Sequence, residues 1–444
     1  MDTLVTLNAG SSSLKLGLFG RVASTRMPPA VARAHVAVHQ HHVELELADA
    51  QGQRLEASQH ALPAQGFDPD QTLDLLLDAL GRHFGTLSIT AVGHRVVHGG
   101  LHFDAPVRVT AQVLTALEAL VPLAPMHQPH NLAAIRIAQR RWPDALQVAC
   151  FDTAFHRSQP LVARSCALPH PLTDSGIERY GFHGLSYEYI SSRLPQVLSR
   201  TAQGRVIVAH LGNGASLCAL LAGRSIATTM GFSVLDGLVM GSRCGTLDPG
   251  VVLYLIQHLG MTADAVSELL YQRSGLLGVS GISSDMETLL ATDTTESREA
   301  LDLFVYRAAC EIGGLAAALG GLDALVFTAG IGEHAAAIRA RISAACGWLG
   351  AMIDESANAV DLELIHAPGS RLDIAVIATD EERMIARHVA DLLPEGFAAA
   401  GPPLLRGSSE RIAPSDQVHQ HNHHRDDQED MDETTHGVGR NHAE

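Results

Sequence analysis

The chain has 444 residues, of which 46% are apolar, and a formal net charge of −17. This length and apolar content are typical of a globular protein with a large core and room for two domains. The negative charge disfavours a nucleic-acid partner. No basic segment precedes the first apolar stretch, so we expect no secretory signal. The longest apolar window, residues 312–332, is interrupted by Asp323 and several glycines, so we interpret it as a helix and a buried strand rather than a membrane span.

Six cysteines are distributed along the chain without CxxC pairs. Their spacing does not match a disulfide framework, which suits a reducing compartment. We therefore interpret the cysteines as buried thiols and expect a cytoplasmic protein.

The chain begins with a predicted hairpin. Residues 4–7 and 14–19 form its strands, and the turn at residues 8–13 is rich in hydroxyl groups and contains one glycine. Serine hydroxyls and backbone amides in such a turn can bind phosphate oxygens, and Lys15 can add a positive charge. Lys15 is the only lysine in the chain. A coding bias towards arginine explains why the other basic positions are arginine, and either chance or function preserved the lysine at position 15.

A second predicted hairpin follows roughly 200 residues later, with strands at residues 205–209 and 217–221. Its loop, residues 210–216, has two glycines that let the backbone approach an anion, with Asn213 and Ser216 as side-chain donors. A loop between two strands differs from a Walker loop or a Rossmann turn, which lead into a helix. The alternative is an ordinary turn without a ligand. Two similar hairpins predict two halves of similar build that face a shared cleft.

Polar side chains follow two further predicted strands. The strand at residues 89–97 ends in a polar segment in which Arg95 lies beside Val97, a combination that suits an anionic substrate with a small apolar body. The strand at residues 146–151 places Asp152 at its carboxyl end, where open α/β sheets collect functional groups. A helix N-cap is the alternative role for Asp152.

Two further side chains lie in glycine-rich segments. Arg243 is surrounded by small residues, so its planar guanidinium can reach a carboxylate or a phosphoryl group. His183 lies between glycines. The alternatives are a surface arginine and a structural histidine in a turn.

The remaining segments alternate between helices and strands. Residues 35–47 alternate in hydropathy and turn at residues 49–52, which predicts an exposed hairpin whose histidines suit a solvated strand better than a metal site. We predict helices at residues 69–83, 131–141, 251–259, 263–271 and 296–320.

Near the C-terminus, a buried strand at residues 324–328 opens into a glycine turn, residues 329–334, that can hold an adenosine. The last strand, residues 374–378, leads into a helix whose first-turn acids, Glu381 and Glu382, complement the helix dipole or bind a metal. Residues 406–444 are polar, rich in histidine and acids, and are predicted to be disordered.

Several of these segments together resemble one family, the acetate kinases. The matching stretches are LNAGSSSLKL, GHRVVHGG, LAPMHQPHN, FDTAFH, RYGFHG, HLGNGAS, MGFSVLDGLVMGSRCGTLDPG, FTAGIGEH and TDEERMIAR, in this order from residue 7 to about residue 387. The resemblance implies the α/β fold of the acetate and sugar kinase, Hsp70 and actin superfamily: a duplicated two-domain actin-like ATPase with its active site in the interdomain cleft. We expect an N-terminal domain at residues 1–150, completed by the helix at about residues 384–400, and a C-terminal nucleotide-binding domain at residues 151–383.

The resemblance also implies roles for individual residues. Catalytic roles fall to Asp152, His183 and Arg243, and the magnesium site to Asn8 and Glu381, although Glu382 is an alternative for the second ligand. Arg95 resembles the acetate-binding arginine, and the acyl pocket corresponds to Val97, Met126, Phe182 and Val234. The implied nucleotide contacts are Lys15, His210, Leu211, Gly212, Asn213, Gly214, Asp285, Met286, Glu287, Gly330, Ile331, Gly332, Glu333 and His334.

The implied activity is Mg²⁺-dependent transfer of a phosphoryl group between ATP and acetate, with Mn²⁺ as a possible substitute, in a homodimer. Asp152 would orient Arg243 or the metal. The alternatives are a propionate or other short-chain acyl kinase, and a nucleotide-binding regulator without catalysis. Glu287, Met126 and Val234 stand where the family usually has arginine, leucine and proline, which bears on nucleotide affinity and on the acyl pocket.

Overall fold

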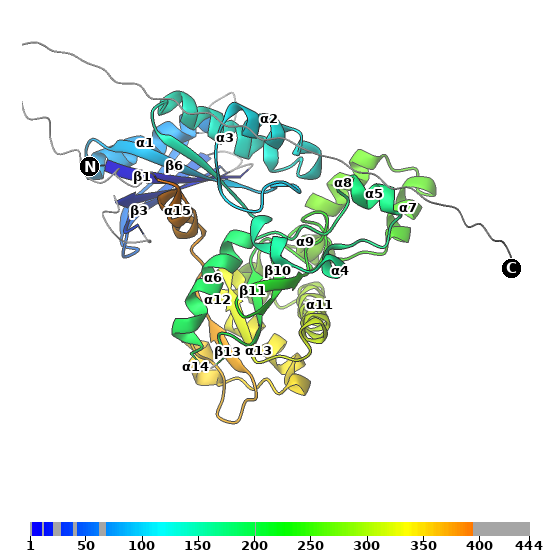
Figure 1. The fold of residues 1–444 in the computed structure, drawn as a ribbon. Helices are drawn as coiled ribbons and strands as arrows, with labels where there is room; N and C mark the ends of the chain where they lie inside the picture. Colours follow the sequence, from blue (N-terminus) through cyan, green and yellow to red (C-terminus); the bar gives the residue numbers. More distant parts are fainter. Residues whose placement is uncertain are drawn as a thin grey trace, which may run out of the picture. The chain divides into compact units, whose positions relative to one another are not determined.

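A computed structural model describes residues 2–10, 13–20, 28–38, 42–61, 68–199 and 201–393 (Figure 1). The predicted tail at residues 406–444 lies outside the described residues, as do Ser11 and Ser12 of the first hairpin turn. The structure is built around two β-sheets with helices packed against them.

The first sheet contains eight described strands in the order β5-β4-β3-β2-β1-β6-β8-β7. β1 (Asp2–Ala9) pairs antiparallel with β2 (Ser13–Gly20) and parallel with β6 (Ser88–Val96), which pairs parallel with β8 (Leu146–Phe151). The first predicted hairpin is therefore confirmed. The remaining strands of this sheet are β3 (Ala30–Val38), β4 (His42–Asp49), β5 (Arg54–Ala61) and β7 (Val107–Arg108).

The predicted hairpin with its turn at residues 49–52 is present, because β4 and β5 pair antiparallel across that turn, but residues 35–47 are covered on one face rather than exposed. β3 and β4 pair antiparallel and continue the sheet outward from β2. Alternate side chains, including those of Val36 and Leu45, are buried against helix α1 (Pro69–Phe84). The polar residues between them misled the prediction, because an antiparallel strand with one covered face alternates in the same way.

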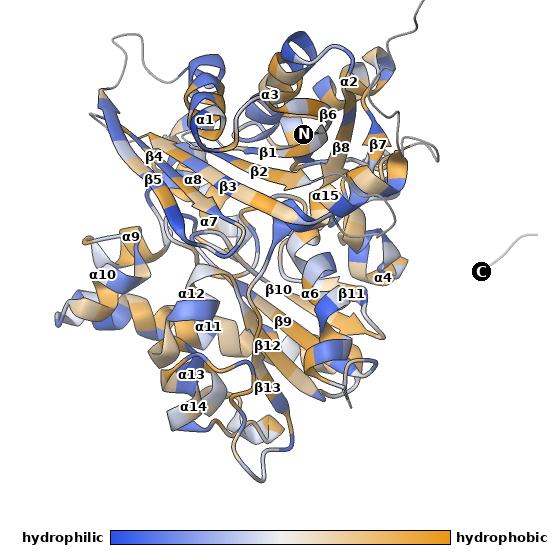
Figure 2. Ribbon diagram, turned by 90° about the vertical axis from the view of Figure 1, so that its left-hand side faces the viewer, coloured by the Kyte–Doolittle hydropathy of each residue, from blue (hydrophilic) through white to orange (hydrophobic). Residues whose placement is uncertain are grey.

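The second sheet contains five described strands in the order β11-β10-β9-β12-β13. They are β9 (Arg205–Leu211), β10 (Ala215–Leu221), β11 (Arg224–Thr228), β12 (Ala324–Thr328) and β13 (Asp373–Val376). β9 pairs antiparallel with β10 and parallel with β12, and β12 pairs parallel with β13. These orders and directions repeat those of β3-β2-β1-β6-β8, so the two predicted hairpins occupy equivalent places in two copies of one unit. Figure 2 colours much of β9, β12 and β13 as hydrophobic, as expected for buried strands.

The predicted helices are confirmed to within a few residues. The helices after α1 are α2 (Ala111–Glu118), α3 (Gln128–Arg141), α4 (Leu161–Arg164), α5 (His170–Asp174), α6 (Gly184–Val197), α7 (Pro249–Gln257), α8 (Ala263–Gln272), α9 (Gly275–Ser280), α10 (Met286–Ala291), α11 (Thr295–Leu319), α12 (Ala329–His334), α13 (Ala336–Ala345), α14 (Glu355–Ala359) and α15 (Glu381–Leu392). Single 3-10 turns occupy Val121–Leu123, Ala154–Ser158 and Gly347–Leu349. None of the described helices has both the length and the apolar character needed to cross a bilayer.

Two smaller expectations need correction. Residues 329–334 form helix α12 rather than a turn, and the Glu333 carboxylate accepts a hydrogen bond from the Ala329 amide at 2.8 Å, which closes the helix at its start. Not all cysteines are buried: Cys310 is exposed on α11, and Cys166 and Cys244 are only partly buried. Helix α11 carries Cys310 on a solvent-facing side, which spacing in the sequence does not reveal.

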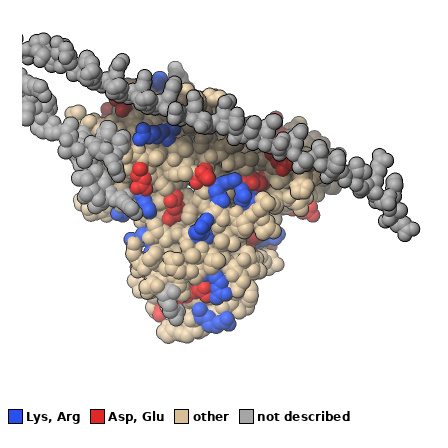
Figure 3. All heavy atoms as spheres, viewed as in Figure 1, with Lys and Arg blue, Asp and Glu red and all other residues tan. Residues whose placement is uncertain are grey.

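Helices α6 and α15 lie between the two sheets. One core cluster contains residues of both sheets together with Leu185 and Leu194 of α6 and Ile385 and Val389 of α15. Gly93 of β6 permits this packing, because a Cβ there would lie 2.4 Å from Ile385 Cγ2. The first residues of α6 and α15 are thereby brought to the carboxyl ends of β6 and β8. On the face in Figure 3, acidic and basic side chains of the described residues are interspersed.

Candidate active site

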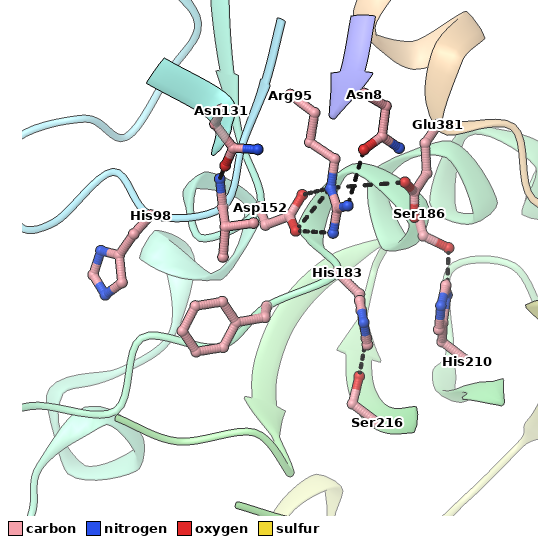
Figure 4. Close-up of polar contacts among 12 residues, drawn as sticks. Asn8, Arg95, His98, Asn131, Asp152, His183, Ser186, His210, Ser216 and Glu381 are labelled. Carbon is pink, nitrogen blue, oxygen red and sulfur yellow. Dashed lines mark hydrogen bonds and ion pairs between the residues drawn. The ribbon is translucent and has the colours of Figure 1, made fainter. Parts of the chain in front are cut away.

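Polar side chains from both sheets converge on one cavity of about 270 Å³. The strands deliver them at their ends: Asn8 from β1, Arg95 from β6, Asp152 after β8 and His210 from β9. The cavity is lined by Asn8, Lys15, Arg95, Val97, His127, Asp152, Phe182, His183, His210, Gly212, Asn213, Gly214, Val234, Arg243 and Glu381. The structure therefore brings together most of the residues singled out in the sequence, and Figure 4 shows polar contacts of some of them, including Arg95, Asp152 and His183.

Arg95 is the centre of the polar network. Its Nε donates to both carboxylate oxygens of Asp152, at 3.0 and 3.1 Å, and its Nη2 donates to Asp152 Oδ2 at 2.6 Å. Its Nη1 donates to Asn8 Oδ1 at 3.1 Å, and Glu381 Oε2 lies 3.9 Å from its Nε (Figure 4). Burial disfavours this charge, but the carboxylates of Asp152 and Glu381 outweigh burial and raise the pKa of Arg95. Arg95 therefore stays cationic.

Asp152 is itself almost fully buried, with 1% of its surface exposed. Burial raises its pKa, and the Arg95 guanidinium opposes that rise. Its side chain caps no helix, and its partner is Arg95. We expected Asp152 to orient Arg243 or the metal. Its side chain contacts Arg95 rather than Arg243, because β6 and β8 are neighbours in register and place Arg95 beside Asp152. The role at the metal stays a prediction.

His183 sits at the N-terminus of α6 in a left-handed backbone conformation, with φ of 58°. The next residue must be glycine, because a Cβ on Gly184 would lie 2.1 Å from the Asp152 carbonyl oxygen. The Gly184 amide donates to that same oxygen at 2.8 Å, so the turn that presents His183 is tied to Asp152. His183 Nδ1 is bonded to Ser216 Oγ at 2.9 Å.

The imidazole of His183 stacks on that of His210, with ring centroids 4.2 Å apart. Burial and the neighbouring His210, Arg95 and Arg243 lower the pKa of His183 well below its ordinary value. Burial, Arg95 and Lys15 lower the pKa of His210 to about 3. Both histidines are therefore neutral at physiological pH and act as hydrogen-bonding groups rather than as cations.

Arg243 has no carboxylate within ion-pair distance among the described residues. Its Nη1 donates to the Val234 carbonyl at 2.8 Å. Burial lowers its pKa to about 10, so it stays charged at neutral pH. Gly214 lies directly beside it, since a Cβ there would be 2.5 Å from Arg243 Nη2 and 3.3 Å from His183 Nε2. Arg243 Nη2 and His183 Nε2 thus converge at the backbone of the second hairpin loop.

The apolar part of the cavity comes from Val97, Phe182 and Val234, as expected from the sequence. Asn131 holds Val97 in place by accepting a hydrogen bond from its amide at 3.0 Å (Figure 4). Met126 does not line the cavity and is 40% exposed. Its neighbour His127 lines the cavity instead, because α3 starts at residue 128 and turns this side chain inward.

His127 is the site residue that sequence reasoning missed. Burial, followed by the charges of Arg243 and Arg95, lowers the pKa of His127 to about 4, so it is neutral in the site. The only signal for it in the sequence was its place within LAPMHQPHN. Local pattern could not show whether Met126 or His127 faces inward.

The residues expected at the adenosine do not line this cavity. Met286 is buried in the core, so only its backbone is available to a ligand, and the same holds for Leu211 of the expected phosphate loop. Asp285 caps α10 by accepting from the Thr288 amide at 2.8 Å, and Glu287 is exposed on the same helix. Within residues 330–334 the side chains differ in exposure: Gly330 and His334 are exposed, Ile331 and Glu333 are partly buried, and Gly332 is buried.

Glu333 is engaged within the protein. Its Oε1 accepts from the amides of Ala329 and Thr379, at 2.8 and 3.1 Å, and so links the ends of β12 and β13. Arg339 is completely buried and donates to the carbonyl oxygens of Gly332 and Glu333, at 3.1 and 2.7 Å. These bonds fix the backbone of α12.

Comparison with known proteins identifies the family of this chain. The model of the acetokinase family matches residues 3–387. The chain belongs to the acetokinase family. An acetate kinase of Rhodopseudomonas palustris is 52% identical over 398 residues, which cover 89% of this chain and 99% of the relative. An acetate kinase of Methylocella silvestris is 47% identical over 402 residues, covering 89% and 99%.

Solved structures of the same family have the same fold. A propionate kinase of Francisella tularensis superposes with a TM-score of 0.80 at 35% identity, covering 88% of this chain and all of that one. An acetate kinase of Porphyromonas gingivalis gives a TM-score of 0.77 at 33% identity, covering 89% and 100%. The duplicated actin-like ATPase fold predicted from the sequence is confirmed.

Membership of the acetokinase family implies ATP or ADP as a substrate and a divalent metal ion. Among the described residues there is no cluster of three or more histidine, cysteine or acidic side chains that could hold a metal alone. Asp152 and Glu381 supply carboxylates and Asn8 an amide oxygen around Arg95. Magnesium is commonly bound by one or two carboxylates plus nucleotide phosphates and water. This donor set fits such a metal.

Proposed function

We propose that the protein catalyses the reversible transfer of the γ-phosphoryl group of ATP to acetate, which gives acetyl phosphate and ADP by direct in-line transfer. The observation that carries the proposal is the convergence of Arg95, Arg243 and His183 beside a small apolar wall in a single cavity. Acetate combines a carboxylate with one methyl group. The cavity offers cations for the carboxylate and apolar side chains such as Val97 for the methyl group.

The reaction needs charge neutralisation more than acid–base chemistry. A carboxylic acid with a pKa of about 4 is already ionised at neutral pH and needs no general base. Its charge repels the γ-phosphate, and this repulsion must be offset while the attacking and leaving oxygens are held in line. We assign acetate binding to Arg95, and stabilisation of the transferred phosphoryl group to Arg243 and His183.

Asp152 is the residue that keeps Arg95 in place. Its bidentate contact fixes the plane of the guanidinium, so that acetate meets a preorganised cation. We propose that Asn8 and Glu381, with Asp152 nearby, hold Mg²⁺, for which Mn²⁺ could substitute, against the nucleotide phosphates. The metal would neutralise phosphate charge. Lys15 and the loop at residues 210–214 would contact the same phosphates.

We place the adenosine near α10 and α12. The exposed residues there, Asp285, Glu287, Gly330 and His334, are free to contact a nucleotide, whereas Met286, Gly332 and Glu333 would act through the backbone. This assignment rests on the family resemblance and on the position of α12 directly after β12.

Propionate is the alternative substrate, since one structurally similar relative is a propionate kinase. Val97 is 3% exposed and fills the wall of the cavity, which favours the smaller acid. Adding one methylene to a ligand in a filled apolar pocket changes binding by about 1–3 kcal/mol. We therefore expect a preference for acetate that is measurable but not absolute.

We also propose that the protein is a cytoplasmic homodimer, with domains divided near residues 150 and 383. Helix α7 supports an interface, because none of its residues is buried and Leu253, Tyr254 and Ile256 expose apolar side chains. An unpartnered apolar helix face commonly marks a contact surface. Analytical ultracentrifugation of the purified protein would test whether it is a dimer.

The deciding experiment is a hydroxamate assay with ATP, magnesium and acetate, run in parallel with propionate and butyrate. The assay detects the acyl phosphate itself. We expect the highest kcat/KM with acetate. No product with any acid, from protein that binds ATP, would overturn the proposal and favour a nucleotide-binding regulator.

A further inference from the structure

A chain of hydrogen bonds runs behind His183, on the side away from the cavity. His183 Nδ1 is 2.9 Å from Ser216 Oγ, and Ser216 Oγ is 2.6 Å from the hydroxyl of Tyr187. Ser216 and Tyr187 are completely buried, on β10 and α6 respectively. No other hydrogen-bond partner of either hydroxyl is found among the described residues.

The hydrogens of this chain can be counted. The Tyr187 hydroxyl has one hydrogen, and Ser216 Oγ is its only acceptor, so the Ser216 hydrogen must point elsewhere. The remaining acceptor is His183 Nδ1, provided that this nitrogen carries no hydrogen. If Nδ1 were protonated, it would donate to Ser216 and one buried hydroxyl hydrogen would have no acceptor. Leaving a buried donor unpaired is costly, so the chain favours unprotonated Nδ1.

The other ring nitrogen faces the site. His183 Nε2 lies beside Gly214 in the second hairpin loop, where Arg243 Nη2 also converges. With Nδ1 unprotonated, the hydrogen of a neutral imidazole is on Nε2, and Nε2 can donate to a phosphoryl oxygen. In the opposite tautomer, Nε2 would present a lone pair to an anion. The tautomer therefore decides whether His183 attracts or repels the transferred group.

We propose that Ser216, which accepts a hydrogen bond from Tyr187, is a positioning residue that holds His183 as the Nε2–H tautomer. His183 is neutral in this site, so it cannot obtain a second N–H by protonation, and its donor capacity depends on where its one hydrogen resides. The inference deepens the proposed phosphoryl transfer, but the tautomer itself can be measured without any reaction.

His210 provides an internal comparison. Its Nδ1 is 2.9 Å from Ser186 Oγ, which is 2.7 Å from the Thr379 hydroxyl. Thr379 is only partly buried, so its hydroxyl can also bond to water and the same count fixes no tautomer. The hydrogen-bond chain behind His183 thus ends in a fully buried hydroxyl, whereas the chain behind His210 ends in a partly exposed one.

The test is ¹⁵N NMR of protein labelled at histidine, at pH 7 and without ligand, because the two ring nitrogens of each tautomer have distinct shifts. The His183 signal is assigned by its loss in His183→Gln. We expect wild-type His183 to be predominantly the Nε2–H form, by about tenfold or more. Ser216→Ala should lower that ratio severalfold. Tyr187→Phe keeps the ring packing and leaves His183 Nδ1 as the only acceptor for the Ser216 hydrogen, so it should change the ratio little.

Tyr189→Phe is the matched control. Tyr189 lies on the same helix and is 8% exposed, but its hydroxyl makes no hydrogen bond to the described residues. It should leave the His183 ratio and the activity unchanged. In Ser216→Ala, kcat should fall by the same factor as the Nε2–H population, which is less than about twofold for a severalfold drop from a ratio of about ten, with KM for acetate and ATP little changed.

A wild-type His183 that is cationic or in the Nδ1–H form would overturn the proposal. So would an unchanged tautomer ratio in Ser216→Ala. If Ser216→Ala does not fold, the tautomer of wild-type His183 alone decides the matter. If the protein had no kinase activity but its tautomer ratio shifted as expected, the proposed function would be refuted, whereas the proposed control of the His183 tautomer would still stand.

Discussion

Replacing Asp152 by asparagine tests the centre of the site. In the native protein, two nitrogens of Arg95, Nε and Nη2, make three contacts of 3.1 Å or less with the two carboxylate oxygens of Asp152, which is 1% exposed. The asparagine side chain has the same shape as that of aspartate, but it has only one acceptor oxygen, and its NH₂ group would face an N–H donor of Arg95. Breaking a buried pair costs about 3–5 kcal/mol. We expect about 3 kcal/mol, because Glu381 still lies 3.9 Å from Arg95 Nε.

The functional loss should exceed the loss of stability. With Asp152 neutral, the Arg95 guanidinium is no longer held in one plane, and misplacing a substrate-binding group by about 1 Å can cost about a hundredfold in rate. We therefore expect kcat/KM for acetate to fall by about a hundredfold or more, measured by the hydroxamate assay, with unfolding followed in urea.

Asp323→Asn is the matched control for this variant. Asp323 forms the same kind of bidentate pair with Arg205, with N–O distances of 3.0 and 2.6 Å, but this pair is partly exposed and does not line the cavity. Solvent screening makes such pairs weak. Asp323→Asn should leave activity unchanged. Activity of Asp152→Asn within tenfold of wild type, or an equal loss in the control, would refute the reasoning.

Three further predictions concern catalysis, pH and packing. Arg243→Ala should bind ADP normally but lose on the order of a thousandfold in kcat; unchanged turnover would refute its role. The free energy of unfolding should fall as the pH drops from 6.5 towards 4, because histidines of the unfolded chain take up protons that the buried neutral histidines exclude. Each such histidine contributes up to about 1.4 kcal/mol per pH unit, and the group consists of His94, His98, His127, His156 and His210. A free energy of unfolding in urea that does not change over this pH range would contradict the prediction. Gly93→Ala should destabilise by about 1–3 kcal/mol, because its Cβ would lie 2.4 Å from Ile385 Cγ2. The control is Gly81→Ala in α1, where the added Cβ has no neighbour within 4 Å, and it should be neutral or stabilising. If both variants changed the free energy of unfolding equally, α15 would have moved to make room for the Cβ at residue 93.

Much of the site could be predicted because its residues lie next to local patterns. Asn8, Arg95, Asp152 and His210 each follow or end an apolar strand, and strand ends in open α/β sheets gather at one edge. The two hairpins were visible as strand, loop and strand, and the repeated sheet order confirms that they are equivalent.

The errors came from contacts between distant segments. Local pattern could not show that Asp152 pairs with Arg95, because that pairing follows from the register of β6 on β8. It could not show that His127 rather than Met126 faces the cavity, since the direction in which α3 starts depends on its packing against β6. It gave no sign that a helix rather than a turn follows β12, where Glu333 closes the first turn.

The sequence by itself determined the strands, the two phosphate-type loops and the residue types of the site, because hydrophobic periodicity and glycine placement act over a few residues. Only the tertiary structure decided which charges are paired, which histidine nitrogens face the cavity and which side chains are neutral. Hydrogen-bond partners and pKa values depend on groups far apart in the chain, such as Tyr187 and Ser216 behind His183. Those distances are fixed only when the two sheets pack around α6 and α15.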